Sequence, residues 1–111
     1  MKLAPLVLVA LISPCVTANA AGNAQVATVV NVDARSDGSF LVSFSKPITT
    51  PPSCATEPYR MAGDASTPGG RAVLAAAMLA YSTGSTVSAQ GTGGCTVYSG
   101  IESILILAQS R

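Results

Sequence analysis

The two thiols of Cys54 and Cys95 are the side chains whose chemistry the sequence defines best. A third cysteine, Cys15, lies in an N-terminal segment that we expect to be removed, which leaves an even pair. An even pair in a small exported protein favours a disulfide, whose long closed loop stabilises the fold by roughly 4 kcal/mol in the chain-entropy description. The alternatives, a metal site or a reactive thiol, are weaker because the chain has no histidine and two thiols alone rarely hold zinc.

The other residue types give little indication of a catalytic site. The chain lacks histidine, which is the commonest general base near neutral pH. Glycoside hydrolysis would need two carboxylates that face one cleft. Asp33 and Asp37 flank a turn, where solvation explains them, and Asp64 and Glu102 have no partner that the sequence identifies. We therefore predict no catalytic residue, no metal and no cofactor.

Tyrosine rings are the remaining candidates for binding, because sugars stack their apolar faces on aromatic rings. Tyr59 and Tyr98 flank loops, and a tyrosine joins an apolar ring to a hydroxyl that can reach a ligand. We therefore predict these two as ligand-binding residues. Phe40 and Phe44, by contrast, share one face of a strand and are expected in the core.

Residues 1–20 have the three-part pattern of a secretory signal peptide. Lys2 provides the positive charge, an apolar run follows, and a small-x-small triplet ends at Ala20. Signal peptidase accepts only small side chains at those positions, so we predict cleavage between Ala20 and Ala21. The product would be a single exported domain of residues 21–111.

Two alternatives to cleavage are weaker. The apolar run is shorter than the roughly 20 residues that a membrane anchor needs. Pro14, directly before Cys15, departs from the small residue that a lipoprotein site requires. We therefore expect a bacterial protein that is periplasmic or secreted and has no membrane span after cleavage.

The exported domain has five acidic and five basic residues, so its net charge is zero. Proteins that bind nucleic acid or anionic lipid usually carry a clustered basic stripe. We therefore do not expect nucleic acid as a partner.

Hydrophobic alternation predicts two strands joined by a hairpin at the start of the domain. One face of residues 25–34 carries mostly β-branched side chains and is expected to be buried: Val26, Thr28, Val30 and Val32. An Asp-Gly turn within residues 36–39 leads into a second strand, which Pro47 ends. A short third strand is expected at residues 59–61.

Residues 68–82 form the clearest predicted helix. Thr67 or Ser66 can cap its start, Pro68 suits its first turn, and Gly84 lies where a left-handed residue commonly ends a helix. One stripe carries the side chains expected in the core: Val73, Leu74, Ala77, Met78 and Tyr81.

The rest of the chain adds two strands. Residues 86–90 alternate like a strand, residues 91–94 are expected to form a hairpin turn beside the disulfide, and residues 95–98 follow. Residues 101–108 contain a continuous apolar run, which is typical of a strand buried on both faces. The predicted class is α+β, mostly β, with five strands and one helix between strands 3 and 4. This order fits a small OB-like barrel, and an open α+β sheet with the helix on one face fits nearly as well.

The segment GGRAVLAAAMLAYSTGSTVSAQGTGGC, followed by Glu102 and a terminal ILIL run, resembles a pattern shared by small secreted bacterial proteins. The layout is similar to that of the receptor-binding B subunits of the subtilase-cytotoxin type. The resemblance covers about the last half of the exported domain and implies an OB fold in glycan-binding pentamers. Its motif consists of structural residues, and Ser85 stands where the pattern usually has lysine, so no sugar-contacting residue is carried over.

These observations favour an exported, non-enzymatic binding module whose partner is a carbohydrate or another protein, and we include a ring-shaped homo-oligomer in this hypothesis. The alternative is a structural or interaction protein of the cell envelope that has no small-molecule ligand. A hydrolase is less favoured because histidine is missing.

Overall fold

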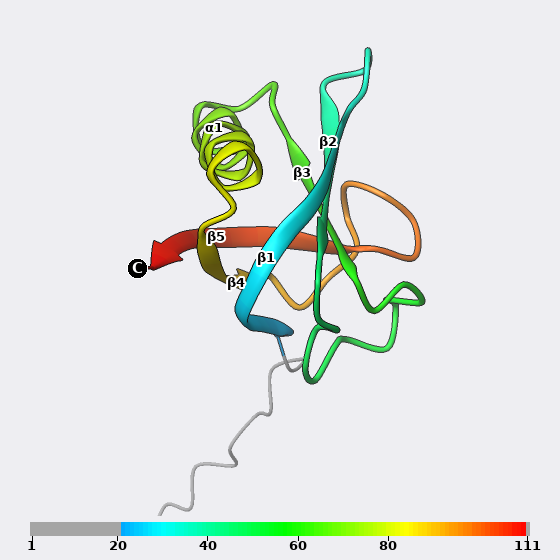
Figure 1. Cartoon of the computed structure of the whole chain (residues 1–111). Coiled ribbons are helices and arrows are strands. Elements are labelled where there is room, and N and C mark those ends of the chain that lie inside the picture. The colour runs from blue at the N-terminus through cyan, green and yellow to red at the C-terminus, as the bar shows by residue number, and fades with distance from the viewer. Residues whose placement is uncertain (1–20, 111) are drawn as a thin grey trace, which may run out of the picture.

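The computed structural model describes residues 21–110, so Ala20 and the rest of the predicted signal peptide lie outside the described residues. The elements follow each other as β1 (Asn23–Ala34), β2 (Ser39–Phe44), β3 (Arg60–Asp64), α1 (Pro68–Thr83), β4 (Thr86–Gly91) and β5 (Glu102–Ser110). The protein is thus mostly β, and its one described helix lies between β3 and β4, as predicted (Figure 1).

Strand pairing runs round the molecule in the order β1-β2-β3-β5-β4, and β4 also pairs with β1, so the ring of pairings closes. The pairing between β3 and β5 is parallel, and the other four are antiparallel. It is also the shortest, because it joins only Met61 to Glu102 and Ala62 to Ser103. The ring is therefore held by the fewest residue pairs between β3 and β5.

Irregular pairing along β1 overturns the predicted inward face at Val26 and Val30, whereas Val32 packs against the core as predicted. Val26 has a φ of 49°, and the register against β4 shifts between Ala24 and Ala27. A second shift, against β2, follows Val29. An extra residue at a bulge reverses the alternation of the side chains beyond it. The buried residues are therefore Ala24, Ala27 and Val29, whereas Val26 is 66% exposed and Val30 52% exposed.

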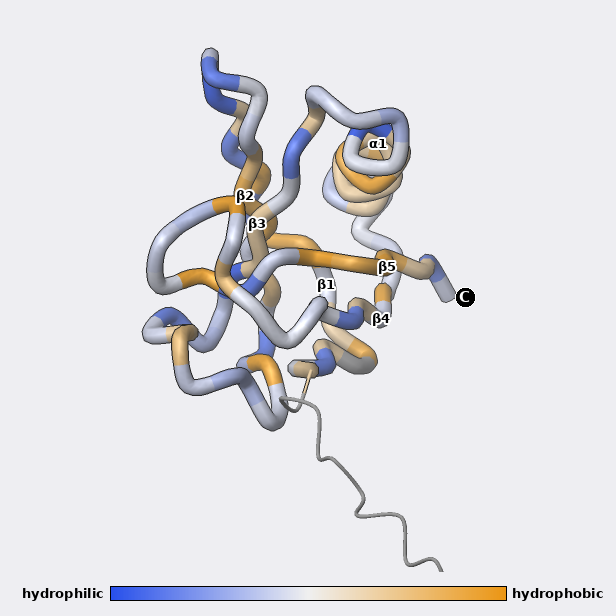
Figure 2. The backbone as a smooth tube through the Cα atoms, turned by 180° about the vertical axis from the view of Figure 1, so that it is seen from behind, coloured by the Kyte–Doolittle hydropathy of each residue, from blue (hydrophilic) through white to orange (hydrophobic). Residues whose placement is uncertain are grey.

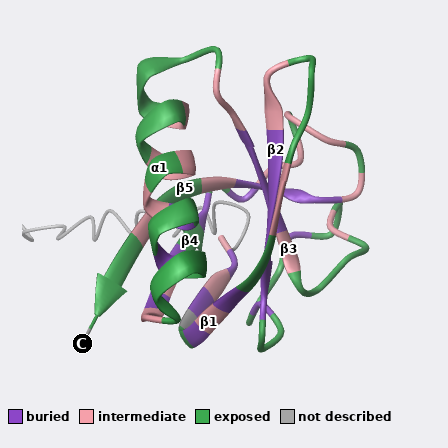
Figure 3. Ribbon diagram, turned by 45° about the horizontal axis from the view of Figure 1, so that its top comes forward, coloured by how far each residue is buried: buried purple, intermediate pink, exposed green. Residues whose placement is uncertain are grey.

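The main hydrophobic core fills the inside of the ring. Phe40 and Phe44 are buried there, as predicted, together with Met61. Gly63 lies under the Phe40 ring, where a Cβ atom would overlap it. A smaller cluster lies on the opposite face of β2 and β3 and consists of Leu41, Ala62 and Ile101, with Val97 and Tyr98 packed against it. β2 is buried by both clusters, whereas much of α1 is exposed (Figure 3).

α1 has the predicted ends to within one residue. The Thr67 hydroxyl accepts a hydrogen bond from the Gly70 N–H and so caps the first turn. Gly84 has a φ of 69°, and its N–H donates to the Ala80 carbonyl at 2.9 Å, which closes the last turn. Within residues 21–110, no helix has the length and apolar character needed to cross a membrane.

β5 is more exposed than predicted. Glu102 and Ser103 are buried, but Leu105 and Ile106 are each about half exposed. The pairing with β3 ends at Ser103, and beyond that point β5 pairs only with β4. The apolar residues that continue along β5 (Figure 2) are therefore not buried on both faces.

The connection between β4 and β5 is a loop rather than the predicted tight hairpin. Gly91 is the last residue of β4, and β5 begins only at Glu102. Residues 95–98 form no strand, and the loop contains one isolated bridge, between Tyr98 and Ile101. The loop is long enough to fold back over β2 and β3, where it buries the smaller cluster.

Candidate binding surface

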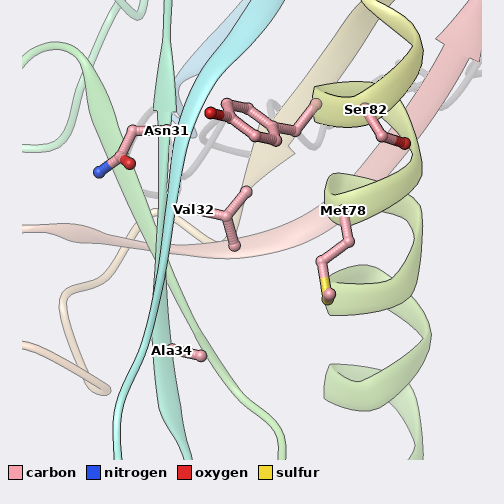
Figure 4. Close-up of a pocket in the computed structure, with 6 residues that line it drawn as sticks. Asn31, Val32, Ala34, Met78 and Ser82 are labelled. Atoms are coloured by element: carbon pink, nitrogen blue, oxygen red, sulfur yellow. The ribbon is translucent and has the colours of Figure 1, made fainter.

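A cleft of about 370 Å³ lies between α1 and β1 (Figure 4). Its lining consists of Asn31, Val32, Ala34, Met78, Tyr81 and Ser82. Val32 and Met78 point toward each other across the gap, whereas the Asn31 amide lies on the far side of β1. The walls are therefore mainly apolar, and none of the lining side chains carries a charge.

The cleft exists because α1 packs against the ring through two small residues. Ala77 and Ala80 are fully buried. Successive residues of a helix are about 100° apart around its axis. Because Ala77 and Ala80 face the ring, Met78 and Tyr81, which follow them in the sequence, point to one side of the helix. The prediction that Met78 and Tyr81 belong to the core is therefore wrong, since they are 57% and 56% exposed.

Other apolar side chains on the same two elements are exposed. Leu79 on α1 and Val30 on β1 each expose more than half of their surface. Contiguous apolar patches on soluble proteins commonly mark sites of interaction, and methionine and tyrosine are enriched in protein interfaces. The cleft can hold an apolar side chain, and its lining contains no pair of groups suited to acid–base or nucleophilic catalysis.

A second hollow, of about 330 Å³, lies beside the start of α1, and its polar groups are already paired. The Thr67 hydroxyl accepts from the Gly70 N–H at 2.9 Å and donates to the Asp64 carbonyl at 3.0 Å. The Asp64 carboxylate accepts from the Ser66 N–H at 2.9 Å. Hydrogen bonds from the side chain and backbone of Ser66 lower the pKa of Asp64. The polar side chains that the start of α1 contributes to this hollow therefore cap the helix.

The two predicted ligand-binding tyrosines lie near opposite ends of β2. The Tyr59 side chain is half exposed, and its carbonyl accepts from the Phe44 N–H at 2.8 Å. Tyr98 is partly buried, and the Arg35 guanidinium lies 4.7 Å from its ring centroid, in cation–π range. Tyr98 therefore joins the β4–β5 loop to the β1–β2 turn, and the two rings do not share one site. Their role in ligand binding stays a prediction.

The predicted disulfide joins Cys54 to Cys95. It links the β2–β3 connection to the β4–β5 loop across a sequence separation of 41. Hydrogen bonds hold the same two segments together, because the N–H groups of Thr56 and Glu57 donate to the Gly100 carbonyl at 2.8 and 3.3 Å. A disulfide fits an extracellular or periplasmic location, where the surroundings are oxidising.

The environment of Glu102 is the feature of the structure that the sequence predicts least. The Glu102 side chain is fully buried, and Oε2 accepts hydrogen bonds from the N–H groups of Gly22 and Gly93 at 2.9 and 3.0 Å. Oε1 has no hydrogen-bond partner among the described residues. A Cβ atom on Gly22 or Gly91 would overlap the carboxylate, so glycine is needed at both positions. Gly91 is predicted from the sequence to lie in a turn, and nothing in the sequence links either glycine to Glu102.

The part of the chain that the structure describes contains no group of three or more histidine, cysteine, aspartate or glutamate side chains placed to hold a metal ion. The similarity to B subunits that the C-terminal half predicts stays a prediction. The chain matches no protein-family model, no curated protein and no solved structure.

Proposed function

We propose that the chain is an exported, non-enzymatic binding module whose α1–β1 cleft holds an apolar segment of a protein partner. The observation that carries this proposal is the cleft itself, in which Met78 and Tyr81 stay more than half exposed. Its volume of about 370 Å³ falls in the range typical of binding sites, about 300–1,000 Å³. Since the lining side chains are uncharged, the segment that fills the cleft is expected to be apolar and uncharged.

The direction of the polar side chains favours a protein partner over a carbohydrate. A sugar is held by several donors and acceptors that converge on its hydroxyl groups. The Asn31 amide points away from α1, and the Ser82 hydroxyl points away from β1 (Figure 4). The cleft therefore offers few converging polar groups, and an apolar side chain is the better match.

An OB-like fold is part of the proposal. It is supported by the strand order β1-β2-β3-β5-β4 and by the position of α1 between β3 and β4. OB folds bind oligosaccharides and oligonucleotides on the face of strands 2 and 3, between the loops that follow strands 1 and 4. In this chain the β4–β5 loop covers that face and packs Ile101 on Leu41 and Ala62. The occupied face is a second reason to place binding at the α1–β1 cleft.

A second copy of the chain is one protein that could fill the cleft, so a homo-oligomer is one form of this proposal. The disulfide supports export, because it needs an oxidising compartment to persist. The alternative function is a structural protein of the envelope that uses no binding cleft.

Site-specific photo-crosslinking in the cell that produces the protein tests the proposal. A photoreactive residue replaces Leu79, which follows the cleft residue Met78 on α1, or Ala72, which is exposed near the start of α1, as the matched control. We expect an adduct from position 79 and none from position 72. We also expect the double substitution Met78→Ser with Tyr81→Ser to abolish the adduct, because it removes two apolar walls.

The mass of the adduct then identifies the partner. Twice the mass of the chain indicates a second copy, and any other mass indicates a different protein. The absence of an adduct from position 79 would overturn the proposal and favour the structural alternative. Binding of the purified domain to a glycan array that is lost in Tyr59→Ala with Tyr98→Ala would replace it with the carbohydrate hypothesis.

A further inference from the structure

Glu102 is a buried carboxylate without a charged partner among the described residues. Between residues 21 and 110 the single ion pair is Arg60 with Glu57, and both of those side chains are well exposed. Burying a carboxylate is costly unless a positive charge or several hydrogen bonds compensate it. The two N–H donors both bind Oε2, so Oε1 is left buried and unpartnered.

The backbone next to this carboxylate is fixed in place. The Gly22 carbonyl accepts from the Gly91 N–H at 2.9 Å. Asn23 and Thr49 exchange two backbone hydrogen bonds, at 3.0 and 2.8 Å. The fold therefore holds the chain at residues 22–23, directly after the predicted cleavage point.

The nitrogen of Ala21 lies near the Glu102 carboxylate. Three covalent bonds separate it from the Gly22 nitrogen, so the two nitrogens are at most about 3.7 Å apart. The Gly22 nitrogen itself is 2.9 Å from Oε2, and Oε1 lies against the Gly22 Cα, where a Cβ atom would overlap it. Rotation about ψ of Ala21 moves its nitrogen near this carboxylate while residues 22 and 23 keep their hydrogen bonds.

Cleavage changes the chemistry of that nitrogen. In the uncleaved chain it is an uncharged amide with one hydrogen. Hydrolysis adds one water across the bond: the oxygen becomes part of the Ala20 carboxylate, and the Ala21 nitrogen becomes an α-amino group. An ordinary α-amino group has a pKa of about 7.7–8.0 and carries a positive charge below it. The cleaved chain thus acquires a cation beside the buried anion.

We propose that Glu102 is the binding site for the α-ammonium group of Ala21, which removal of residues 1–20 creates. The new ion pair partners Oε1 and stabilises the closed ring where β5 begins. The inference rests on the predicted cleavage point and is independent of the α1–β1 cleft, so either proposal can fail without the other.

The test compares chains that differ only at the α-amino group. The first begins at Ala21 with a free amine, the second begins at Ala21 and is Nα-acetylated, and the third retains Ala20. Each is made as the wild type, as Glu102→Gln and as Glu57→Gln, in which an exposed carboxylate is removed as a matched control. Unfolding in urea gives the folding equilibrium constant of each form.

We expect acetylation or retention of Ala20 to lower the folding equilibrium constant roughly tenfold or more in the wild type and in Glu57→Gln, because it leaves a buried charge unpaired. In Glu102→Gln the three N-termini should give the same constant. Equal constants for the free and acetylated wild type would overturn the proposal.

A second measurement does not depend on whether Glu102→Gln folds. The α-amino group of the wild type is labelled with ¹³C-methyl groups, which keep its charge, and NMR follows its titration. We expect its pKa to lie above that of the same labelled group in the urea-unfolded chain. An unshifted pKa, or a natural N-terminus at a residue other than Ala21 in the exported protein, would also contradict the proposal.

Discussion

The two sides of the molecule differ in how far their side chains are bonded or covered. On the disulfide side, defined by the β2–β3 connection and the β4–β5 loop, Cys54 is bonded to Cys95, and Arg35 covers the ring of Tyr98. On the cleft side, defined by α1 and β1, Met78 and Tyr81 have no such cover. Under the proposed function, one side contributes stability and the other binds a partner, so substitutions should separate the two properties.

Removal of the disulfide should have the largest effect on stability. We expect Cys54→Ser with Cys95→Ser to lose about 4 kcal/mol of unfolding free energy, because the unfolded chain regains the entropy of a long open loop. Urea unfolding measures the loss. The adduct from position 79 should persist under conditions in which the variant is still folded, and its loss there would contradict the separation of the two sides.

A matched pair of glycine substitutions tests the packing around Glu102. Gly91→Ala places a Cβ atom where it would overlap the Glu102 carboxylate, and we expect a loss of about 1–3 kcal/mol from overpacking. Gly69→Ala, in the first turn of α1, meets nothing within 4 Å and should stabilise by up to about 1 kcal/mol. Thermal and urea unfolding of both variants check the comparison, and equal effects would refute the close fit of the glycines.

Substitution in the cleft should change binding with little change in stability. Met78→Ser with Tyr81→Ser is expected to shift the unfolding free energy by about 0.5 kcal/mol or less, because both side chains are more than half exposed. The adduct from position 79 should nevertheless disappear. A large loss of stability would mean that the cleft belongs to the core.

The smallest effect is expected at the β1–β2 turn. The Asp37 carboxylate accepts hydrogen bonds from the Ser39 hydroxyl at 2.6 Å and the Ser39 N–H at 2.9 Å, which lower its pKa from the ordinary 3.8. A lowered pKa contributes stability above the ordinary value, and this contribution is lost as the pH falls through the lower folded value. Asp37→Asn should therefore flatten the acid limb of a melting-temperature profile slightly, and an unchanged profile would contradict the assignment.

Features that depend on neighbouring residues could be predicted from the sequence. The ends of α1 follow from Thr67 and Gly84, which act within one turn of the helix. The disulfide is a separate case: it follows from the number of cysteines and the expected compartment, since only one pairing is left if residues 1–20 are removed as predicted. The order of strands and helix follows from alternation and turn residues.

Features that depend on distant contacts could not be predicted. Val26 takes a positive φ where the register of β1 against β4 shifts, and no residue type in the segment indicates that shift. On α1, the buried alanines and the exposed Met78 are all apolar, so hydropathy alone does not show which edge faces the ring. Glu102 meets Gly22 across a separation of 80 positions, far beyond the range of a local motif.

The sulfur bridge also determines what a protease can do to this molecule. The stretch between Cys54 and Cys95 contains β3, α1 and β4. A single backbone cut anywhere in that stretch leaves the N-terminal and C-terminal fragments covalently joined. The nicked chain therefore keeps all of its strands in one covalently joined molecule.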